Sequence, residues 1–223
     1  MRYRNEIKHV ISPADKAALL ARLRAVMKRD AHAGPDGKYL VRSLYFDNVY
    51  DRALRDKLSG VSEREKFRLR YYNGDPSLIH LEKKVKKGGL GYKISETVTR
   101  DEADRIIRGD VNWMASSGRA LLVELYARMK SEGLRPKTLV DYTRTPFVYA
   151  PGNVRVTIDE NIRTGLACTD FLNPQCITVP ATRDIVLEVK WDEFLPAPVK
   201  SAVRLKSVRA TAFSKYAACR RYD

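Results

Sequence analysis

Charged and apolar residues alternate most regularly in residues 64–72, a pattern that predicts a β-strand. Apart from Glu65, one face of this strand is apolar, with Phe67, Leu69 and Tyr71. The other face carries only cations, namely Arg64, Lys66, Arg68 and Arg70. Neighbouring cations on that face are roughly 6.5–7 Å apart, so they repel one another unless acidic groups or a polyanion lie against them. The row is therefore either a solvated face or the wall of a binding site.

The same alternation predicts further strands at residues 2–10, 39–46, 78–86, 91–98, 138–144, 154–159 and 185–191. Apolar spacing and capping residues predict helices at about 13–28, 48–57, 100–109, 115–131, 196–204 and from 214 onward. Ser12 is the expected N-cap of the first helix, and Asp47 or Asn48 that of the second. Residues 165–183 resemble a loop or weak hairpin. No repeat or linker divides the chain, so residues 1–223 are predicted to form one domain.

Several of these strands pair an apolar face with a face on which Lys or Arg accompanies a single Glu or Asp. Two arrangements satisfy this pattern. Antiparallel strands can form a flat sheet whose basic face is solvated. Alternatively, they can close into a barrel whose helices cover the apolar outside, with the charged residues inside. An inward ring of cations is costly without compensation, so the second arrangement requires an interior that binds an anion.

The overall charge is strongly basic. The 223 residues include 42 Lys and Arg against 27 Asp and Glu, which gives a net charge of +15. The hydrophobic content of 44% suffices for a packed core and excludes a disordered basic tail. The charge favours a polyanionic partner: nucleic acid, an anionic membrane or a phosphorylated molecule. Lys and Arg donors suit phosphate best, and without a glycine-rich phosphate loop the side chains must bind it.

Localisation and redox state follow from what the chain contains. No signal peptide or membrane-spanning run is visible, so a cytoplasmic protein is predicted. The three cysteines, Cys168, Cys176 and Cys219, lack metal-ligand spacing and are expected to be reduced packing residues. The three histidines are scattered without a partner, which makes histidine chemistry improbable.

Carboxylates on the predicted charged face admit two interpretations. They are Glu6, Glu82, Asp159 and Glu188. Each could simply neutralise neighbouring cations. Alternatively, one or two of them could complete the coordination of Mg²⁺ or Mn²⁺ together with phosphate oxygens. A metal that bridges phosphates and is surrounded by Lys and Arg is typical of sites that catalyse phosphoryl transfer.

A set of short motifs, in this order, runs over nearly the whole chain. They are Glu6-Ile7-Lys8, Ser43-Leu44-Tyr45-Phe46-Asp47, Arg64 to Arg70, Leu81-Glu82-Lys83-Lys84, Lys93, Asp141 to Phe147, Val154 to Asp159, Val186 to Lys190 and Phe213-Ser214-Lys215-Tyr216. Together they resemble the VTC domain, the catalytic module of polyphosphate polymerases. That domain belongs to the triphosphate tunnel metalloenzymes, also called CYTH-like proteins. The resemblance favours an α+β fold: an antiparallel β-barrel tunnel of about eight strands with a charged interior and helices outside.

The resemblance also implies roles for individual residues. The expected catalytic cations are Lys8, Arg68, Arg70, Arg144, Arg155 and Lys215. Further phosphate-binding residues are Lys66, Lys84, Lys93, Tyr142, Lys190 and Ser214, of which Lys66, like Arg64, is assigned from alternation alone. The expected metal ligands are Glu188 first, then Glu6 and Glu82, for Mn²⁺ or Mg²⁺. The wider group often carries Glu-x-Glu-x-Lys on its first strand, whereas this chain has Arg4-Asn5-Glu6-Ile7-Lys8, which suits the polymerase branch.

The expected function is an ATP-dependent polyphosphate polymerase, which binds ATP or another triphosphate and polyphosphate. Three alternatives remain open: a triphosphate hydrolase of the same fold, a silent sensor of polyphosphate or inositol phosphates, and a nucleic-acid-binding module. No stacking-aromatic sheet motif supports the last, so no specific nucleic acid is expected. A membrane partner protein that receives the polymer is compatible with the sequence.

Overall fold

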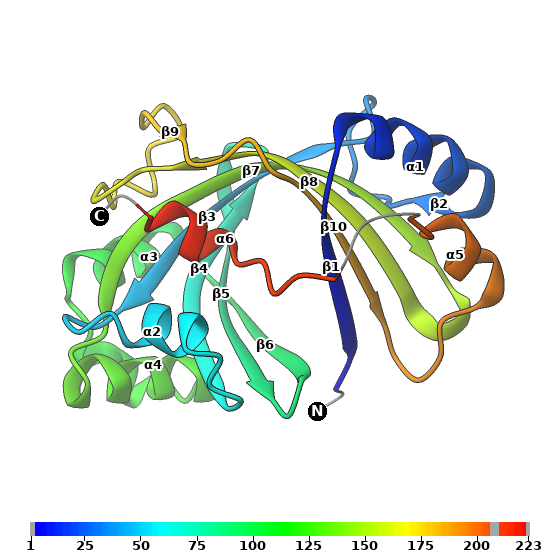
Figure 1. Cartoon of the computed structure of the whole chain (residues 1–223). Coiled ribbons are helices and arrows are strands. Elements are labelled where there is room, and N and C mark those ends of the chain that lie inside the picture. The colour runs from blue at the N-terminus through cyan, green and yellow to red at the C-terminus, as the bar shows by residue number, and fades with distance from the viewer. Residues whose placement is uncertain (1–2, 206–209, 222–223) are drawn as a thin grey trace.

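The computed structural model describes residues 3–205 and 210–221 and consists of a curled antiparallel sheet with helices around it (Figure 1). The strands are β1 (Asn5–Ile11), β2 (Lys28–Arg29), β3 (Tyr39–Asp47), β4 (Arg64–Tyr72), β5 (Asp75–Lys87), β6 (Leu90–Val98), β7 (Arg135–Tyr149), β8 (Val154–Thr164), β9 (Val179–Pro180) and β10 (Ile185–Trp191). The helices are α1 (Pro13–Val26), α2 (Arg52–Leu58), α3 (Arg100–Arg108), α4 (Ala120–Ser131), α5 (Ala197–Ala202) and α6 (Lys215–Cys219). Two 3₁₀ turns, η1 (Asn112–Ser116) and η2 (Pro151–Asn153), complete the set.

Eight strands form one continuous path in the order β1-β10-β8-β7-β3-β4-β5-β6, with β2 and β9 paired beside it. Every pairing is antiparallel. The sheet curls until its two edges meet at a single isolated bridge between Arg4 and Gly91, with N–O distances of 3.0 and 3.4 Å. The predicted α+β class and the inward-curved antiparallel sheet of about eight strands are thus confirmed.

Strand β4 has the predicted bounds, but β7 and β8 are longer than the sequence pattern indicated. The register between them shifts between Asp141 and Thr143, where Asn161 and Ile162 of β8 oppose Tyr142 alone, so a bulge interrupts the alternation of β8. Strand β7 has its own irregularity at Lys137, opposite Tyr45 and Phe46 of β3. Since the face pattern changes at a bulge, a period of two recovers only part of each strand. The two-residue strands β2 and β9 are too short to show any period.

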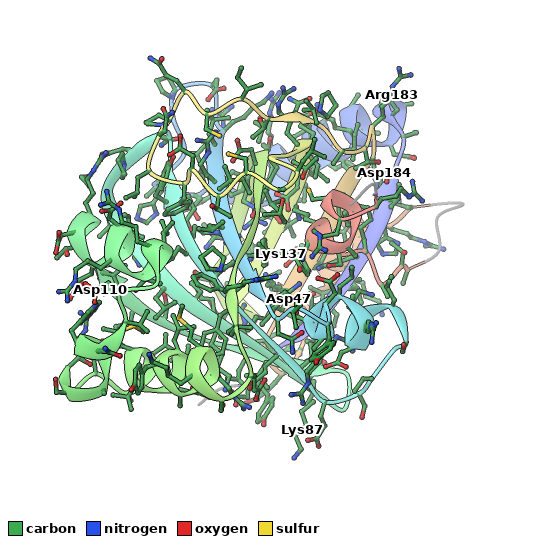
Figure 2. The ribbon with its side chains drawn as sticks, turned by 90° about the vertical axis from the view of Figure 1, so that its left-hand side faces the viewer. Asp47, Lys87, Asp110, Lys137, Arg183 and Asp184 are labelled. Carbon is green, nitrogen blue, oxygen red and sulfur yellow. The ribbon has the colours of Figure 1, made fainter. Side chains whose placement is uncertain are left out.

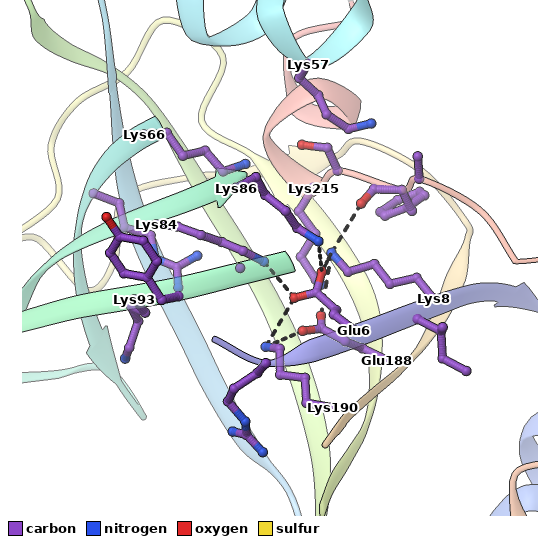
Figure 3. Close-up of a pocket in the computed structure, with 18 of the residues that line it drawn as sticks. Glu6, Lys8, Lys57, Lys66, Lys84, Lys86, Lys93, Glu188, Lys190 and Lys215 are labelled. Atoms are coloured by element: carbon purple, nitrogen blue, oxygen red, sulfur yellow. Dashed lines mark hydrogen bonds and ion pairs between the residues drawn. The ribbon is translucent and has the colours of Figure 1, made fainter. Parts of the chain in front are cut away.

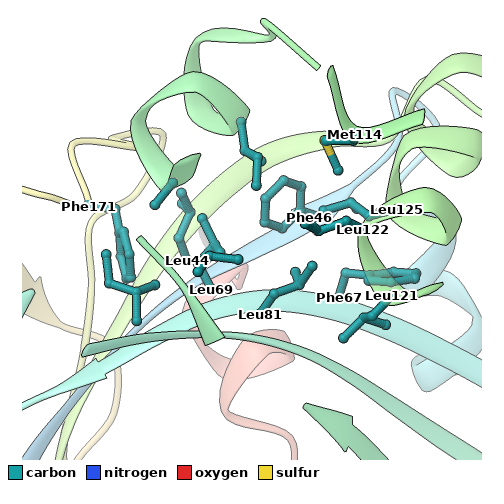
Figure 4. Close-up of a cluster of buried hydrophobic side chains, with 14 of the residues drawn as sticks. Leu44, Phe46, Phe67, Leu69, Leu81, Met114, Leu121, Leu122, Leu125 and Phe171 are labelled. Atoms are coloured by element: carbon teal, nitrogen blue, oxygen red, sulfur yellow. The ribbon is translucent and has the colours of Figure 1, made fainter. Parts of the chain in front are cut away.

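Apolar residues on the convex side of the sheet are covered by helices, as predicted. One core joins β3, β4 and β5 to η1 and α4, and Figure 4 shows it. Its labelled members include Leu44, Phe46, Phe67, Leu69, Leu81, Met114, Leu121, Leu122 and Leu125. A second core packs α1 and α5 on β1, β8 and β10. Apolar positions in these two cores therefore face the outer helices, while the concave side carries most of the charged positions and a smaller apolar cluster around Tyr45, Tyr142 and Tyr216.

Two short helices, α2 and α6, lie on the concave side, which the sequence did not indicate. Tyr216 of α6 stacks on Tyr45 of β3, with ring centroids 5.0 Å apart. Asp47 at the end of β3 is fully buried and accepts hydrogen bonds from the backbone N–H groups of Ala53 (2.9 Å) and Leu54 (3.2 Å) and from the Tyr216 hydroxyl (2.7 Å). The Asp47 carboxylate thus ties both inner helices to the sheet. Figure 2 shows Asp47 near α2, and Lys87 pointing away from the protein.

The predicted start of the second helix needs correction. Helix α2 begins at Arg52 with Asp51 as its N-cap, not at Asp47 or Asn48. Both predicted capping side chains nevertheless accept hydrogen bonds from the first turn of α2. The Asn48 side-chain oxygen accepts from the Arg52 N–H at 3.1 Å, and the Asp47 carboxylate accepts from the Ala53 N–H at 2.9 Å. The capping chemistry was therefore recognised, but the intervening residues form an irregular turn.

The α4 core offers a direct test of this packing. Leu122 is fully buried, whereas its neighbour Val123 is 37% exposed. We expect Leu122→Ala to lower the free energy of unfolding by about 2–5 kcal/mol through lost burial and a residual cavity. Val123→Ala, on the exposed side of the same helix, is expected to change it by less than about 0.5 kcal/mol. Urea denaturation measures both, and equal losses would contradict the assignment of the buried face.

Candidate functional site

The concave side of the sheet encloses a cavity of about 680 Å³, a typical volume for a small-molecule site. Eight lysines and six arginines line it, against three glutamates. The cations are Arg4, Lys8, Lys57, Arg64, Lys66, Arg68, Arg70, Lys84, Lys86, Lys93, Arg144, Arg155, Lys190 and Lys215. Of the three glutamates, Glu65 directs its carboxylate elsewhere, to Lys83 and Arg128. The cavity wall is therefore almost uniformly cationic.

The structure brings the predicted site residues together in this cavity, with one exception. Those that line it are Glu6, Lys8, Lys66, Arg68, Arg70, Lys84, Lys93, Tyr142, Arg144, Arg155, Glu188, Lys190, Ser214 and Lys215. Arg64, assigned from alternation, also lines it. The exception is Glu82, which lies behind the wall. Their positions are thus as expected, while their roles in binding or catalysis stay predictions.

Two carboxylates, Glu6 and Glu188, face the cavity from neighbouring strands β1 and β10 (Figure 3). Lys8 lies 3.2 Å from Glu6 and 3.7 Å from Glu188. Lys84 reaches Glu6 at 2.8 Å, and Lys190 pairs with Glu188. Burial alone would raise the pKa of both carboxyl groups, but these lysines hold each pKa well below its usual range. Both groups are therefore ionised at neutral pH.

Asp159 of β8 organises a second group of cations and is fully buried. Arg144 donates two hydrogen bonds to it, at 2.7 and 2.8 Å, and Lys215 of α6 lies 2.6 Å from it. Although burial opposes ionisation, Arg144 and Lys215 lower the pKa of Asp159 to about 2. The buried Asp159 carboxylate thus fixes two cavity cations, Arg144 of β7 and Lys215 of α6, which are far apart in the sequence.

The prediction that Glu82 is a metal ligand is not supported by its position. Glu82 is 1% exposed and does not line the cavity. Arg68 contacts one of its carboxylate oxygens at 2.6 Å, Arg70 lies 3.7 Å from the same oxygen, and Lys93 contacts the other. Within residues 3–205 and 210–221, no three metal-ligating side chains cluster together. Glu82 instead holds cations in place, the alternative that the sequence left open.

Several lining residues were not predicted. Lys86 shares its strand face with Lys84, so alternation could have identified it. Lys57 comes from helix α2, whose place inside the sheet has no signal in the sequence. Aromatic residues also line the cavity: Tyr39, Tyr45, Tyr72 and Tyr92. The Tyr39 hydroxyl accepts a hydrogen bond from Arg155 at 3.0 Å, and Asp30 holds the same guanidinium at 2.5 Å.

Comparison with protein families gives one match: residues 3–222 match the VTC domain model. The chain belongs to the VTC domain family. A search of curated proteins found no match.

Solved structures add a likeness of fold. One is HpAC1 from Hippeastrum, described as an adenylyl cyclase candidate with a dominant triphosphatase activity. It is 13% identical, with a TM-score of 0.50 over 90% of this chain and 83% of that chain. A second is described as a candidate adenylate cyclase from Bacillus halodurans; it is 15% identical, with a TM-score of 0.49 over 85% of this chain and 80% of that chain. At such identities the likeness to HpAC1 shows the fold alone, and that fold is the triphosphate tunnel type.

The VTC domain's cavity residues suit a divalent metal beside Glu6 and Glu188. Mg²⁺ and Mn²⁺ prefer oxygen ligands and are usually held by one or two carboxylates plus substrate phosphates. Glu6 and Glu188 are both ionised and face the same space. Without a bound anion, the neighbouring lysines neutralise the two carboxylates. When a phosphate binds, these lysines can pair with it and leave the carboxylates to a metal. The donor set therefore fits a metal shared between Glu6, Glu188 and phosphate oxygens.

Three cations of this VTC domain lie in the cavity without any carboxylate partner among the described residues. Lys57 has no ion pair, and Arg64 only donates to the Val61 carbonyl. Lys66 lies over the rings of Tyr45 and Tyr216, 5.3 and 5.9 Å from their centroids. Burial, reinforced by Lys8 and Arg68, lowers the pKa of Lys66 to about 8. These three cations are therefore the ones that most need an anion.

Tyr45 is a buried phenol set among cations. It accepts a hydrogen bond from the Arg68 guanidinium at 2.7 Å and stacks on Tyr216. Burial would raise the pKa of its hydroxyl, but Arg68, Lys66 and Arg70 outweigh burial and lower it to about 7. In the folded protein the phenol is therefore half ionised near neutral pH, whereas in the unfolded chain it titrates near its ordinary value of about 10.

This shift predicts a pH dependence of stability. Because the folded-state pKa is depressed, the contribution is fully present above pH ~10 and is lost as the pH falls through about 7. From pH 7 to 9, the unfolding free energy of the wild type should rise by about 2 kcal/mol relative to Tyr45→Phe. Urea denaturation at each pH measures this, with Tyr126→Phe, on the outer helix α4, as control. If the unfolding free energies of the wild type and Tyr45→Phe change in parallel with pH, the depressed pKa assigned to Tyr45 is contradicted.

Proposed function

We propose that this VTC domain is an ATP-dependent polyphosphate polymerase. It transfers the terminal phosphoryl group of a nucleoside triphosphate to the end of a polyphosphate chain held in the same cavity. The observation that carries this proposal is the excess of cations. Fourteen line the cavity, and six carboxylates of the described residues contact them: Glu6, Asp30, Glu82, Asp159, Glu188 and Asp192. Such a surplus suits a polymeric phosphate better than a single triphosphate.

The chemistry requires no nucleophile from the protein. A terminal oxygen of the acceptor chain attacks the γ-phosphorus, the bond between that phosphorus and the β–γ bridging oxygen breaks, and the nucleoside diphosphate leaves with the electron pair. The protein's task is to align the reactants and to stabilise the charge on the phosphoryl group that is transferred. Arg68, Arg70 and Arg144 line the cavity and supply positive charge for this group. A divalent metal, when bound by Glu6 and Glu188, would supply further charge neutralisation.

Two groups of lining residues support a division of labour. Glu6 and Glu188 combine carboxylates with lysines and suit the reacting phosphates and a metal. Lys57, Arg64 and Lys66 are cations without acidic partners among the described residues and suit the non-reacting phosphates of the polymer. Both groups line one cavity, so donor and acceptor can meet inside it.

Incubation of the purified protein with ATP and Mn²⁺ tests the proposal. We expect ADP and a phosphate polymer in matching amounts, with ADP formed once for each phosphate added. The polymer is detected by gel electrophoresis and by its digestion with a polyphosphate-specific phosphatase. ATP incubated without protein is the control. If neither polymer nor ADP forms, the reaction claim fails.

Other products would identify the alternatives. Free phosphate without polymer indicates a triphosphate hydrolase, the activity named for HpAC1. Tight tripolyphosphate binding without turnover indicates a sensor. RNA binding that tripolyphosphate does not displace indicates a nucleic-acid-binding module, whose affinity should fall steeply with salt. Among the described residues, no helix is long and apolar enough to cross a membrane.

A further inference from the structure

The segment between β8 and β9 carries two of the three cysteines, outside the cavity. Cys168 and Cys176 have their sulfur atoms 3.1 Å apart. Both side chains are half-buried, whereas Cys219 is buried in α6. The sequence predicted three separate packing cysteines, so this contact is not anticipated from their spacing. Two thiols this close differ from a lone cysteine, because each is the other's natural reaction partner.

The loop that carries the pair is already held in place by other contacts. Phe171, between the two cysteines, is fully buried, and its ring lies 4.8 Å from that of Tyr71. The Tyr71 hydroxyl donates to the Phe171 carbonyl at 2.9 Å. Arg42 donates to the carbonyls of Asn173 (2.5 Å) and Cys176 (3.2 Å). On the Cys168 side, the Gly165 N–H donates to the Leu139 carbonyl at 3.0 Å and the Cys168 N–H donates to the Gly165 carbonyl at 2.9 Å. Since these contacts hold both sides of the loop, the sulfurs can bond with only a small adjustment.

We propose that Cys168 and Cys176 form a redox-active dithiol that is converted to an intrachain disulfide by a low-molecular-weight disulfide such as oxidised glutathione. One cysteine thiolate attacks a sulfur of the reagent, forms a mixed disulfide and releases one glutathione thiolate. The second cysteine thiolate attacks the protein sulfur of that mixed disulfide and releases the second glutathione. The reagent gains two electrons and the protein loses two, with the two thiol protons passing to the released thiolates.

The two sulfurs have unequal roles in this exchange. Burial and the contact with Cys168 raise the pKa of the Cys176 thiol to about 11, so few Cys176 thiolates exist at neutral pH. Cys168 also accepts a hydrogen bond from the Asp170 N–H at 3.4 Å. Cys168 is therefore the first to attack, and Cys176 resolves the mixed disulfide.

The consequence is mechanical rather than catalytic. Residues 164–183 contribute nothing to the cavity lining among the described residues. The disulfide closes a short loop around Phe171 and so restrains it against opening. Turnover at saturating substrate is expected to be the same in both redox states, whereas the oxidised protein should resist heat and proteolysis better.

The sequence provides a precise test, because trypsin releases residues 164–183 as one peptide with both cysteines, while Cys219 lies in residues 216–220. The native full chain is incubated with oxidised glutathione and the reaction is quenched with acid. The protein is then denatured, alkylated at its free thiols and digested with trypsin, and the peptide masses are measured by mass spectrometry. We expect the 164–183 peptide to be unalkylated and two hydrogen masses lighter than its reduced form. The Cys219 peptide should remain fully alkylated and serves as internal control.

Three variants sharpen the test. Cys219→Ser should leave the disulfide unchanged. Cys176→Ser should stop at a glutathione adduct on Cys168, whereas Cys168→Ser should react at least tenfold more slowly. A doubly alkylated 164–183 peptide after prolonged exposure would overturn the proposal. So would cysteine-linked dimers on a non-reducing gel in place of the intrachain product.

Discussion

Glu188→Gln is expected to lower the rate of phosphoryl transfer by at least about 100-fold at a fixed Mn²⁺ concentration. Glutamine keeps the size of the side chain but loses the charge that a divalent metal requires. Glu188 faces the cavity beside Glu6, and both are ionised. Removal of one of the two suitable ligands should therefore weaken metal binding directly. The initial rate measured over a range of Mn²⁺ concentrations should show a higher metal requirement and a lower maximum.

A matched control and a second readout separate metal loss from a damaged fold. Glu160→Gln removes a carboxylate that pairs with Lys16 and Lys38 outside the cavity lining, and its turnover should stay near that of the wild type. Calorimetry should show that Glu188→Gln binds tripolyphosphate without metal at least as tightly as the wild type, because a repelling charge is gone. Unchanged turnover in Glu188→Gln would contradict the metal role of Glu188.

Asp159→Ala is expected to have the largest effect on stability, a loss of about 3–5 kcal/mol. Asp159 is fully buried and holds Arg144 and Lys215. Without it, two cations stay in the wall with no compensating charge. Because its folded-state pKa is depressed to about 2, the stabilisation is present above pH ~4 and is lost as the pH falls through 2. Urea denaturation at neutral pH measures the loss.

Tripolyphosphate should reverse much of this loss, since its charge can replace the missing carboxylate beside Arg144 and Lys215. The half-exposed residue Asp104, which pairs with Arg108 on α3, supplies the control: Asp104→Ala should cost less than about 0.5 kcal/mol. Equal stability of wild type and Asp159→Ala would show that Asp159 does not carry the compensation assigned to it. A loss that tripolyphosphate leaves unaltered would show that the anion does not reach this part of the wall.

Much of the fold and of the site's composition could be predicted because alternation reports directly on which face is buried. Phe67 and Leu69 lie in the outer core, and Arg68 and Arg70 in the cavity wall. The start of β7 and the end of β8 could not be predicted, since the irregularities at Lys137 and Asn161 break the period there. Such patterns specify the face on which a residue lies but not its depth, so Glu82 could not be distinguished from Glu6.

Contacts between segments far apart in the sequence also escaped prediction. Asp47 binds the Tyr216 hydroxyl across the fold and thereby places α6, with Lys215, inside the sheet. Neither the strand that carries Asp47 nor the helix that carries Tyr216 shows this contact in its own pattern. The proximity of Cys168 and Cys176 likewise depends on Phe171 docking against Tyr71. Such pairings are decided by tertiary packing and become visible only with the structure.

The central claim is that one cavity holds a triphosphate and its metal inside the curled sheet. A crystal structure of the protein soaked with tripolyphosphate and Mn²⁺ tests it most directly. We expect phosphate density between Arg68, Arg70 and Lys8, and an anomalous metal peak that contacts Glu188 or Glu6 and a phosphate oxygen. Tripolyphosphate bound only on the outer surface, with the cavity cations still paired to their carboxylates, would contradict the claim.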